Sequence, residues 1–406
     1  MSFEMYVPDY AARVIERLEK NGYEAYLVGG CVRDSFLGNI PGDYDMTVSS
    51  KPEETEKCFD GFRIIETGIK HGTVTVVSEG HNIELTTFRC DGEYKDNRRP
   101  ETVSFTGDIH EDTARRDFTV NAMAYSPLRG LVDDYGGAED IENKIIRCVG
   151  DAETRFDEDA LRIMRGLRFA AVLGFTIEEK TGDAIIRKRE LLKNISVERI
   201  FTELKKLLTG KFAVPLLEGY RCVFETVIPE LSGMSDDEYA AACGFTAEFD
   251  TPEECFAAWL SPLSPETAGD ICFRLKTDVK FRKTVVFLIE NRNTEFRSAG
   301  AVRRFAGENG RERLPLLVGF RRKTGAPENT FLTEAAKLSA DKNACFSVAE
   351  LKVSGSDIAA LGIRGKAIGE TLVRLLEAVA DGSVQNEKEP LLDFCREKLA
   401  AEGDFK

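Results

Sequence analysis

The chain has 406 residues, a length that suits two to four folded units better than one compact core. Its hydrophobic content of 42% and charged content of 31% are typical of a globular protein, and its net charge of −15 at first argues against a nucleic-acid partner. No apolar run approaches the roughly 20 residues needed to span a bilayer, so we expect no membrane segment.

The first predicted element is an amphipathic helix over residues 9–20, in an N-terminal stretch without the basic and apolar segments of a signal peptide. The ten cysteines are scattered and include no Cys-x-x-Cys pair, which disfavours zinc knuckles and a disulfide framework. Both features predict a cytoplasmic protein with reduced thiols.

Short β-branched or alternating runs follow, separated by Gly, Asp and Pro, and they predict strands. These runs cover residues 24–30, 43–50, 71–77, 82–89 and 102–107. A second helical pattern lies near 112–124. We therefore predict an α+β head of about 145 residues with a mixed sheet that is mostly antiparallel in its centre.

After about Asp151 the strand patterns end, and apolar residues recur at helical spacing. The clearest stretches are 157–175, 197–210 and 367–382, each with a glycine at or near its end. The rest of the chain is therefore predicted to be all-α. Possible breaks lie in an acidic stretch at 232–255 and at Gly325-Ala326-Pro327.

The stretch from Leu27 to Thr47 carries the clearest chemistry. Gly29-Gly30 allows a backbone to approach a ligand closely, and its N–H groups can hold phosphate oxygens. Asp43 and Asp45 share one face of an extended strand, and two carboxylates so close favour a divalent metal between them. Each half alone is more typical of a glycine turn or a solvated loop, but together they indicate metal-assisted phosphoryl or nucleotidyl transfer.

A third carboxylate would complete such a site, because two-metal centres usually need a further bridging ligand. Glu84 is the candidate, since it alternates with Ile83 and Leu85 on a predicted strand of the head. An ordinary surface glutamate fits the same pattern.

Arg115, Arg116 and Asp117 precede an apolar stretch and are predicted to begin a helix. Arginine binds phosphate through paired hydrogen bonds and keeps its charge. A structural Arg–Asp pair is the equally ordinary alternative.

The stretch at 156–169 predicts a helix in which Asp159 and Arg162 are neighbours and Arg165 and Arg168 continue a cationic row. A carboxylate accepts hydrogen bonds and a guanidinium donates them. Such a pair matches the donor–acceptor order of cytosine and adenine and opposes that of uracil and guanine. The alternative is a routine ion pair on a solvated helix, worth a few tenths of a kcal/mol.

Residues 274–323 carry fourteen Lys or Arg against five Asp or Glu, a local charge of +9 in an acidic chain. This contrast fits an RNA-binding surface, and it fits a solvated helical face equally well.

These motifs resemble those of the class II tRNA nucleotidyltransferases, the CCA-adding enzymes, within the polymerase-β-like superfamily. The resemblance covers nearly the whole chain and is most specific in LVGGCVRD, GDYDMT, HGTVTV, IELTTFR, RRDFTVNA and EDALRIMRGLRF. The stretch VSGSDIAALGIRGKAIGETLVRLL resembles the family's tail more weakly.

The resemblance implies a seahorse-like arrangement of a catalytic head (1–145), a neck that recognises the base (146–210), an RNA-binding body (211–325) and a tRNA-binding tail (326–406). It implies CTP and ATP as substrates, tRNA as the partner, Mg²⁺ as the cofactor, and a monomer or homodimer. The implied metal ligands are Asp43 and Asp45, with Glu84 on the strand of the third catalytic carboxylate. The residues implied to bind the nucleotide are Gly30, Arg33, Arg116, Asp159, Arg162, Arg165 and Arg168. The loop 89–103 resembles a mobile loop thought to help switch from C to A addition.

Three alternatives remain open. Relatives that add only CC or only A share nearly all these motifs. A bacterial poly(A) polymerase usually has a more arginine-rich segment where this chain has GIKHGTVTV. A non-catalytic RNA-binding protein would not need the aspartate pair. With three histidines, His71, His81 and His110, the chain is not expected to carry a His/Asp phosphohydrolase domain.

Overall fold

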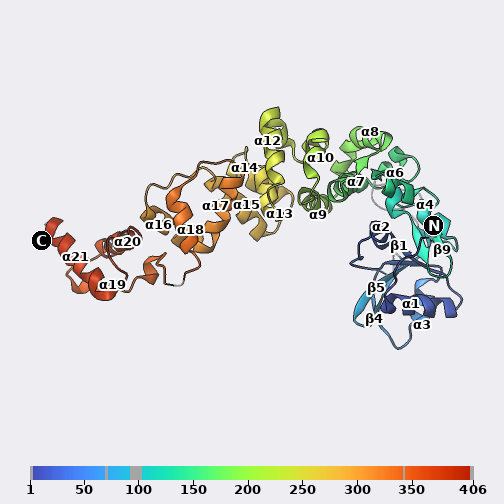
Figure 1. Cartoon of the computed structure of the whole chain (residues 1–406), viewed down its shortest axis with the longest axis horizontal. Coiled ribbons are helices and arrows are strands. Elements are labelled where there is room, and N and C mark those ends of the chain that lie inside the picture. The colour runs from blue at the N-terminus through green and yellow to red at the C-terminus, as the bar shows by residue number, and fades with distance from the viewer. Residues whose placement is uncertain (1–2, 69–71, 92–102, 342, 403–406) are drawn as a thin grey trace. The chain divides into compact units, whose positions relative to one another are not determined.

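The computed structural model describes residues 3–68, 72–91, 103–341 and 343–402 (Figure 1). Contacts divide the chain into two compact units. The first comprises the residues up to Pro252 together with Ile271–Thr277, and the second comprises Glu253–Asp270 and the residues from Asp278 onward. The division into four parts at 145, 210 and 325 stays a prediction. Among the described residues, no helix has the length and apolar character needed to cross a membrane.

A seven-stranded mixed sheet lies in the first unit, with the strand order β3-β4-β5-β2-β1-β8-β9. Its strands are β1 (Ala25–Val28), β2 (Met46–Val48), β3 (Arg63–Gly68), β4 (Thr73–Ser78), β5 (His81–Thr87), β8 (Ala124–Ser126) and β9 (Gly130–Val132). Strands β2 and β5 pair in parallel, whereas the other described neighbours pair antiparallel. The predicted mixed, mostly antiparallel sheet is confirmed. A separate hairpin pairs β6 (Arg89–Asp91) with β7 (Val103–Phe105).

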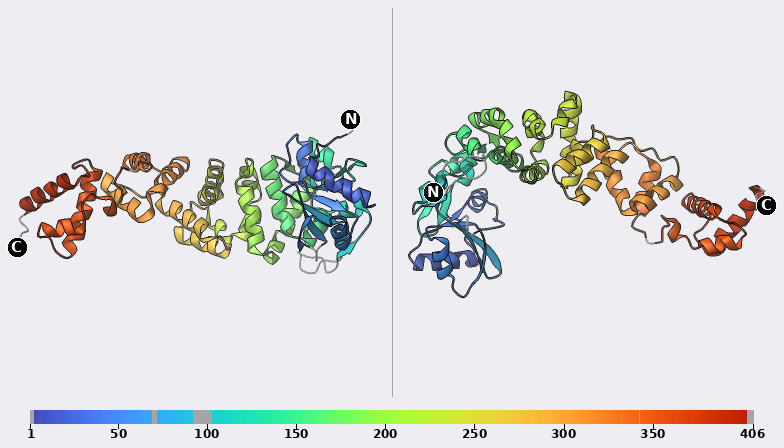
Figure 2. Two further views of the ribbon diagram at one scale, coloured as in Figure 1. Left: turned by 90° about the horizontal axis from the view of Figure 1, so that it is seen from below. Right: turned by 180° about the vertical axis from the view of Figure 1, so that it is seen from behind.

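Two helices, α1 (Asp9–Lys20) and α3 (Pro52–Cys58), pack against strands of the sheet. Helix α1 contacts β1 and β4, and α3 packs beside it on β4 (Figure 2). The predicted helix over 9–20 is confirmed. It forms there because Ala11, Val14, Ile15 and Leu18 recur at helical spacing and are all buried.

The predicted helix near 112–124 is wrong. Helix α4 (Ile109–Ala114) ends early, and a short 3-10 turn, Thr119–Asn121, leads directly into β8. Phe118, Val120 and Met123 are all buried, so the segment is enclosed on every side and does not present one helical face to the core. Tertiary packing here outweighs the local helical pattern.

In its described residues, the remainder of the first unit is helical apart from β10 (Ile145–Ile146) and β11 (Thr176–Ile177), which pair in parallel. Its helices are α2 (Gly30–Phe36), α5 (Gly137–Glu142), α6 (Ala152–Glu158), α7 (Leu161–Leu173), α8 (Glu179–Lys188), α9 (Val197–Leu208), α10 (Ala213–Gly219), α11 (Arg221–Val227) and α12 (Asp236–Thr246). Helix α7 packs against α9 and α10, and it ends where Gly174 adopts a left-handed conformation.

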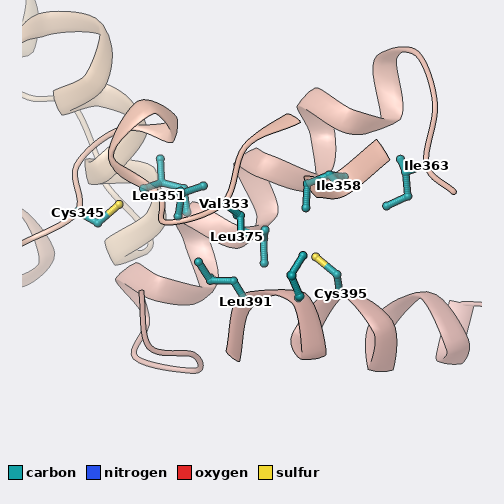
Figure 3. Close-up of a cluster of buried hydrophobic side chains, with 10 residues drawn as sticks. Cys345, Leu351, Val353, Ile358, Ile363, Leu375, Leu391 and Cys395 are labelled. Carbon is teal, nitrogen blue, oxygen red and sulfur yellow. The ribbon is translucent and has the colours of Figure 1, made fainter. Parts of the chain in front are cut away.

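The second unit is helical in its described residues. Its helices are α13 (Pro252–Trp259), α14 (Pro265–Arg274, shared with the first unit), α15 (Val279–Asn291), α16 (Ala299–Asn309), α17 (Leu314–Lys323), α18 (Thr330–Leu338), α19 (Gly355–Ala360), α20 (Lys366–Ala380) and α21 (Lys388–Glu402). Figure 3 shows a core near its C-terminal end, where Leu351, Ile358, Leu375, Leu391 and Cys395 gather.

Candidate active site

The aspartate pair lies on the segment that leads into β2. Asp43 and Asp45 are exposed, whereas Tyr44 and Met46 are buried, so both carboxylates lie on one face as predicted from strand spacing. The backbone N–H of Val28 on β1 donates to the carbonyl of Asp45 at 3.0 Å and ties this segment to the sheet.

Glu84 lies on the neighbouring strand β5, exposed between buried Ile83 and Leu85. In the parallel pairing of β2 with β5, Met46 is opposite Leu85. The residues that precede these two are therefore at the same level of the sheet. They are Asp45 and Glu84, so the sheet brings the third carboxylate beside the pair.

The electrostatics of this group show that the carboxylates repel one another. The pKa of Asp45 is raised to about 6, mainly by partial desolvation and also by the charges of Asp43 and Glu84, while Arg116 opposes the shift. A divalent cation held by the pair would relieve this repulsion. In the described part of the chain, no group of three or more His, Cys, Asp or Glu residues is arranged to hold a metal ion. The candidate ligand set is therefore the pair Asp43 and Asp45.

The glycine turn lies between β1 and α2. Gly29 has a φ of 71°, a conformation that favours glycine, and a β-carbon there would lie 3.4 Å from Nη1 of Arg116. The chain can therefore turn sharply into Gly30, the first residue of α2, beside a guanidinium.

Arg33 projects from α2 and is fixed by two partners. Its Nη1 donates to Oδ1 of Asn121 at 2.8 Å, and its Nη2 donates to Oδ1 of Asp34 at 2.7 Å. The side chain is about 12% exposed, so its orientation is set by the protein before any ligand binds.

Arg115 and Arg116 share one fully buried carboxylate, that of Asp112. Nη2 of Arg115 donates to Oδ1 at 2.7 Å, and Nη2 of Arg116 donates to Oδ2 at 3.2 Å. Burial by itself would raise the pKa of Asp112, but the two guanidinium charges and their hydrogen bonds outweigh it and lower that pKa. A charged carboxylate therefore anchors both arginines.

Two arginines of α7 are held in the same way. Nε of Arg165 donates to Oδ2 of buried Asp117 at 2.7 Å, and Nε of Arg168 donates to Oε2 of Glu203 on α9 at 2.7 Å. Although burial by itself raises the pKa of Asp117, the charge and hydrogen bonds of Arg165 hold it at about 2. Helix α7 thus presents two anchored cations.

These groups meet in one cavity of about 630 Å³ in the first unit. Eight of the ten predicted site residues line it, namely Gly30, Arg33, Asp43, Asp45, Glu84, Arg116, Arg165 and Arg168. Carboxylates from the sheet and guanidiniums from α2, α7 and the segment after α4 therefore face the same space. Such a cavity suits a polyphosphate that binds together with a divalent cation.

Asp159 and Arg162 are not part of the described cavity lining, and the prediction that they lie on one continuous helix is wrong, although the N–H of Arg162 donates to the carbonyl of Asp159 at 3.0 Å. Asp159 lies between α6 and α7 in an extended conformation. Its Oδ1 accepts the N–H of Leu161 at 3.1 Å, the kind of side-chain bond that competes with helix continuation.

The two side chains have other partners. The carboxylate of Asp159 accepts a hydrogen bond from Nη2 of Arg199 at 3.0 Å. Arg162 is buried and donates from Nη1 to Glu158 at 2.6 Å and from Nη2 to the carbonyl of Arg115 at 2.8 Å. Asp159 still lies close enough to Arg165 for its charge to help raise the pKa of that arginine, after the larger effect of Asp117.

The cavity also contains residues that sequence reasoning did not assign to it. Besides Arg115 and Asp117, which the sequence singled out without a site role, these include Asn121, Phe169 and Lys206. Asn121 belongs to the RRDFTVNA motif and Phe169 follows Arg168 directly, so the motifs contained both signals. Nothing in the pattern of α9 indicated that Lys206 would reach this cavity.

The predicted mobile loop 89–103 falls largely outside the described residues. Its described ends pair in the hairpin of β6 with β7, where Asp91 is opposite Val103. Residues 92–102, with Arg98-Arg99-Pro100, are not described, so the role of this loop stays a prediction.

The predicted basic segment 274–323 uses part of its charge within the fold. Arg274 pairs with Glu230 at 2.6 Å in the first unit. In the second unit Arg321 and Arg303 are buried, and Arg303 lies 4.0 Å from the ring centroid of Phe346. These three cations are structural. The RNA-binding surface stays a prediction, and it would have to consist of the other cations of this segment.

Comparison with known proteins agrees with this geometry. Residues 25–147 match the family described as "Poly A polymerase head domain", and residues 174–233 match "Probable RNA and SrmB- binding site of polymerase A". The chain is 37% identical to a CCA-adding enzyme of Streptococcus suis and 38% identical to one of Bacillus velezensis. Each alignment covers 95% of this chain and 96% of the relative.

A solved structure supports the same relationship. The crystal structure of the Bacillus stearothermophilus CCA-adding enzyme in complex with CTP superposes with a TM-score of 0.77 at 32% identity. The match covers 97% of this chain and 98% of that one. The chain therefore belongs to the family of CCA-adding enzymes, which are tRNA nucleotidyltransferases.

Proposed function

We propose that this chain adds C, C and A in turn to the 3′ end of tRNA, using CTP and ATP and releasing pyrophosphate without a nucleic-acid template. The observation that carries the proposal is the cavity in which exposed Asp43 and Asp45 face the anchored guanidiniums of Arg33, Arg165 and Arg168. Membership of the family and the CTP complex of the relative support the substrate class.

Asp43 and Asp45 would hold Mg²⁺, and the raised pKa of Asp45 supports this, because repulsion between carboxylates favours a bound divalent cation. When bound, the ion would lower the pKa of the RNA 3′ hydroxyl and stabilise charge on the α-phosphate during in-line attack. Glu84, at the same level as Asp45, would add negative potential beside the pair and keep the cation at this end of the cavity.

The cationic side of the cavity would hold the triphosphate. Arg33 and Arg116 lie beside the glycine turn, and the N–H of Gly30 adds a donor there. Arg165 and Arg168 would reach the phosphates from α7. Since each guanidinium is anchored before the ligand arrives, the arginine side chains would lose little conformational entropy on binding. The same guanidiniums would stabilise the negative charge of the leaving pyrophosphate.

Asp159 and Arg162 would choose the base. The complementarity of a carboxylate and a guanidinium with cytosine and adenine supports this role. Their present hydrogen bonds to Arg199 and Glu158 must then be exchanged for bonds to the base, so selection involves a rearrangement at the junction of α6 and α7.

The helical remainder would bind tRNA through its backbone and shape, which suits a family that acts on many tRNAs. We place this activity in the cytoplasm, in a monomer or homodimer, and the scattered cysteines support a reducing compartment.

The test is extension of tRNA transcripts that end before C74, C75 and A76, followed by sequencing of the products. We expect CCA, CA and A, respectively. Addition of CC alone, of A alone or of a long A tract would instead identify a partial enzyme or a poly(A) polymerase. If the protein binds CTP but adds no nucleotide to any of the transcripts, it is a nucleotide-binding protein without this activity.

A further inference from the structure

Phe169 is a lining residue of the cavity with no assigned role in the proposed reaction. It is about 6% exposed, and three guanidinium groups surround its ring. The Cζ atoms of Arg168, Arg165 and Arg33 lie 3.7, 5.3 and 5.4 Å from the ring centroid. All three distances are within the range of cation–π attraction.

The ring of Phe169 also packs against a second aromatic ring, that of Phe118. Phe118 meets it edge-on, with ring centroids 5.9 Å apart and an interplanar angle of 78°. A β-carbon at Gly166 would lie 3.0 Å from the ring of Phe118, so glycine at this position allows Phe118 to pack closely on α7. The orientation of Phe169 is therefore set by packing that does not involve the ligand.

The three guanidiniums come from two different elements, since Arg33 lies on α2 and the other two lie on α7. Like charges that converge on one cavity repel each other. The π face of Phe169 attracts all three, and it is the neighbour that they share. It can therefore set their spacing in a way that their separate carboxylate partners cannot.

We infer that Phe169 is a positioning residue for the phosphate-binding arginines. Its ring holds Arg33, Arg165 and Arg168 at the spacing that fits a triphosphate, and so it sets nucleotide affinity irrespective of the base. This inference rests on the proposed function, because it assumes that a nucleoside triphosphate occupies the cavity.

The test compares variants that lose the ring, Phe169→Leu and Phe169→Met, with Phe169→Tyr, which keeps it. We expect KM for CTP and for ATP to rise by about tenfold in both ring-less variants, with the ratio between the two nucleotides unchanged. Phe169→Tyr should retain KM close to that of the unaltered protein. In calorimetry, the Kd for CTP should rise by a similar factor in the ring-less variants. The Kd for CMP, which lacks two phosphates, should change little.

Phe59→Leu is the matched control, because Phe59 is a fully buried ring with an edge-on neighbour, Phe62, and a nearby guanidinium, that of Arg17 at 5.8 Å. It lies outside the cavity lining, so it should lower Tm and leave KM unchanged. An unchanged KM in both ring-less variants would overturn the inference, as would a change confined to CTP or to ATP. If the unaltered protein binds CTP but extends no tRNA, the proposed function fails while the Kd comparison still decides the role of the ring.

Discussion

The two sides of the cavity are built in different ways. The carboxylate side comes from adjacent strands. Asp43, Asp45 and Glu84 alternate with buried residues, and the pairing register of the strands brings their carboxylates together. The arginine side depends in part on partners that are distant in sequence: Arg165 lies 48 positions from Asp117, and Arg33, which also pairs with the adjacent Asp34, lies 88 positions from Asn121. Strand alternation therefore predicts the carboxylate side from the local sequence, whereas the long-range contacts of the arginine side form only in the folded unit.

The largest effect should come from the carboxylate side. We expect Asp43→Ala and Asp45→Ala to lower kcat for nucleotide addition by at least about 10³-fold, because metal-ion stabilisation of the transition state is worth several kcal/mol. Binding of tRNA, followed by gel shift, should persist. Glu84→Ala is the companion variant, and a smaller loss there would separate a supporting carboxylate from the metal ligands. Turnover that survives in either aspartate variant would refute the metal assignment.

The arginine side is best disrupted through a buried partner. Asp117→Asn leaves Arg165 without its charged acceptor, and we expect unfolding free energy to fall by about 3 kcal/mol, as when one member of a buried pair is removed. Urea denaturation measures this loss. Glu153→Gln, which breaks an exposed pair with Arg187, should change stability by less than about 0.5 kcal/mol. Equal losses in the two variants would contradict the anchoring role of Asp117.

The same pair predicts a pH effect. The pKa of Asp117 is about 2 in the folded protein and near 3.8 otherwise, so its stabilising contribution is fully present above pH 4. It is lost as pH falls through the folded pKa. The stability gap between the unaltered protein and Asp117→Asn should therefore narrow by about 2 kcal/mol between pH 4 and pH 2. Denaturant titrations at several acidic pH values measure the gap, and a constant gap would argue against a charged Asp117.

The smallest effect concerns selectivity. Asp159→Ala or Arg162→Ala should relax discrimination of CTP and ATP against UTP and GTP by about tenfold, because a mismatched base no longer leaves buried polar groups without partners. Competition assays with mixed nucleotides measure the ratio. Arg187→Ala, at an exposed position outside the cavity lining, is the control. Selectivity that holds in both variants would place base reading elsewhere.

The sequence predicted the carboxylate side well because the period of a strand is local. Buried Tyr44 and Ile83 assign their neighbours to the opposite face without any knowledge of the fold. The head domain, its mixed sheet and the helix over 9–20 follow from the same kind of pattern, and the motif resemblance identified the family correctly.

Two predictions failed, one because of a local side-chain hydrogen bond and the other because of tertiary packing. The helical spacing of Asp159 and Arg162 was real, but the side chain of Asp159 bonds to the backbone and separates α6 from α7. The helical pattern after Arg116 was overridden because Phe118 pairs its backbone with Cys148 and packs on α7. Partners such as Glu203 for Arg168 could not be read from spacing at all, since they depend on how α7 meets α9.

Arg33, Arg165 and Arg168 in the cavity each already have a carboxylate partner of their own. An empty site is consequently not a cluster of bare cations, and the departure of an anion leaves charges that the protein itself neutralises. The free-energy difference between the occupied and vacated states is thereby kept small. A catalyst that takes up a triphosphate and discharges pyrophosphate three times on one RNA needs such easy exchange more than it needs tight retention.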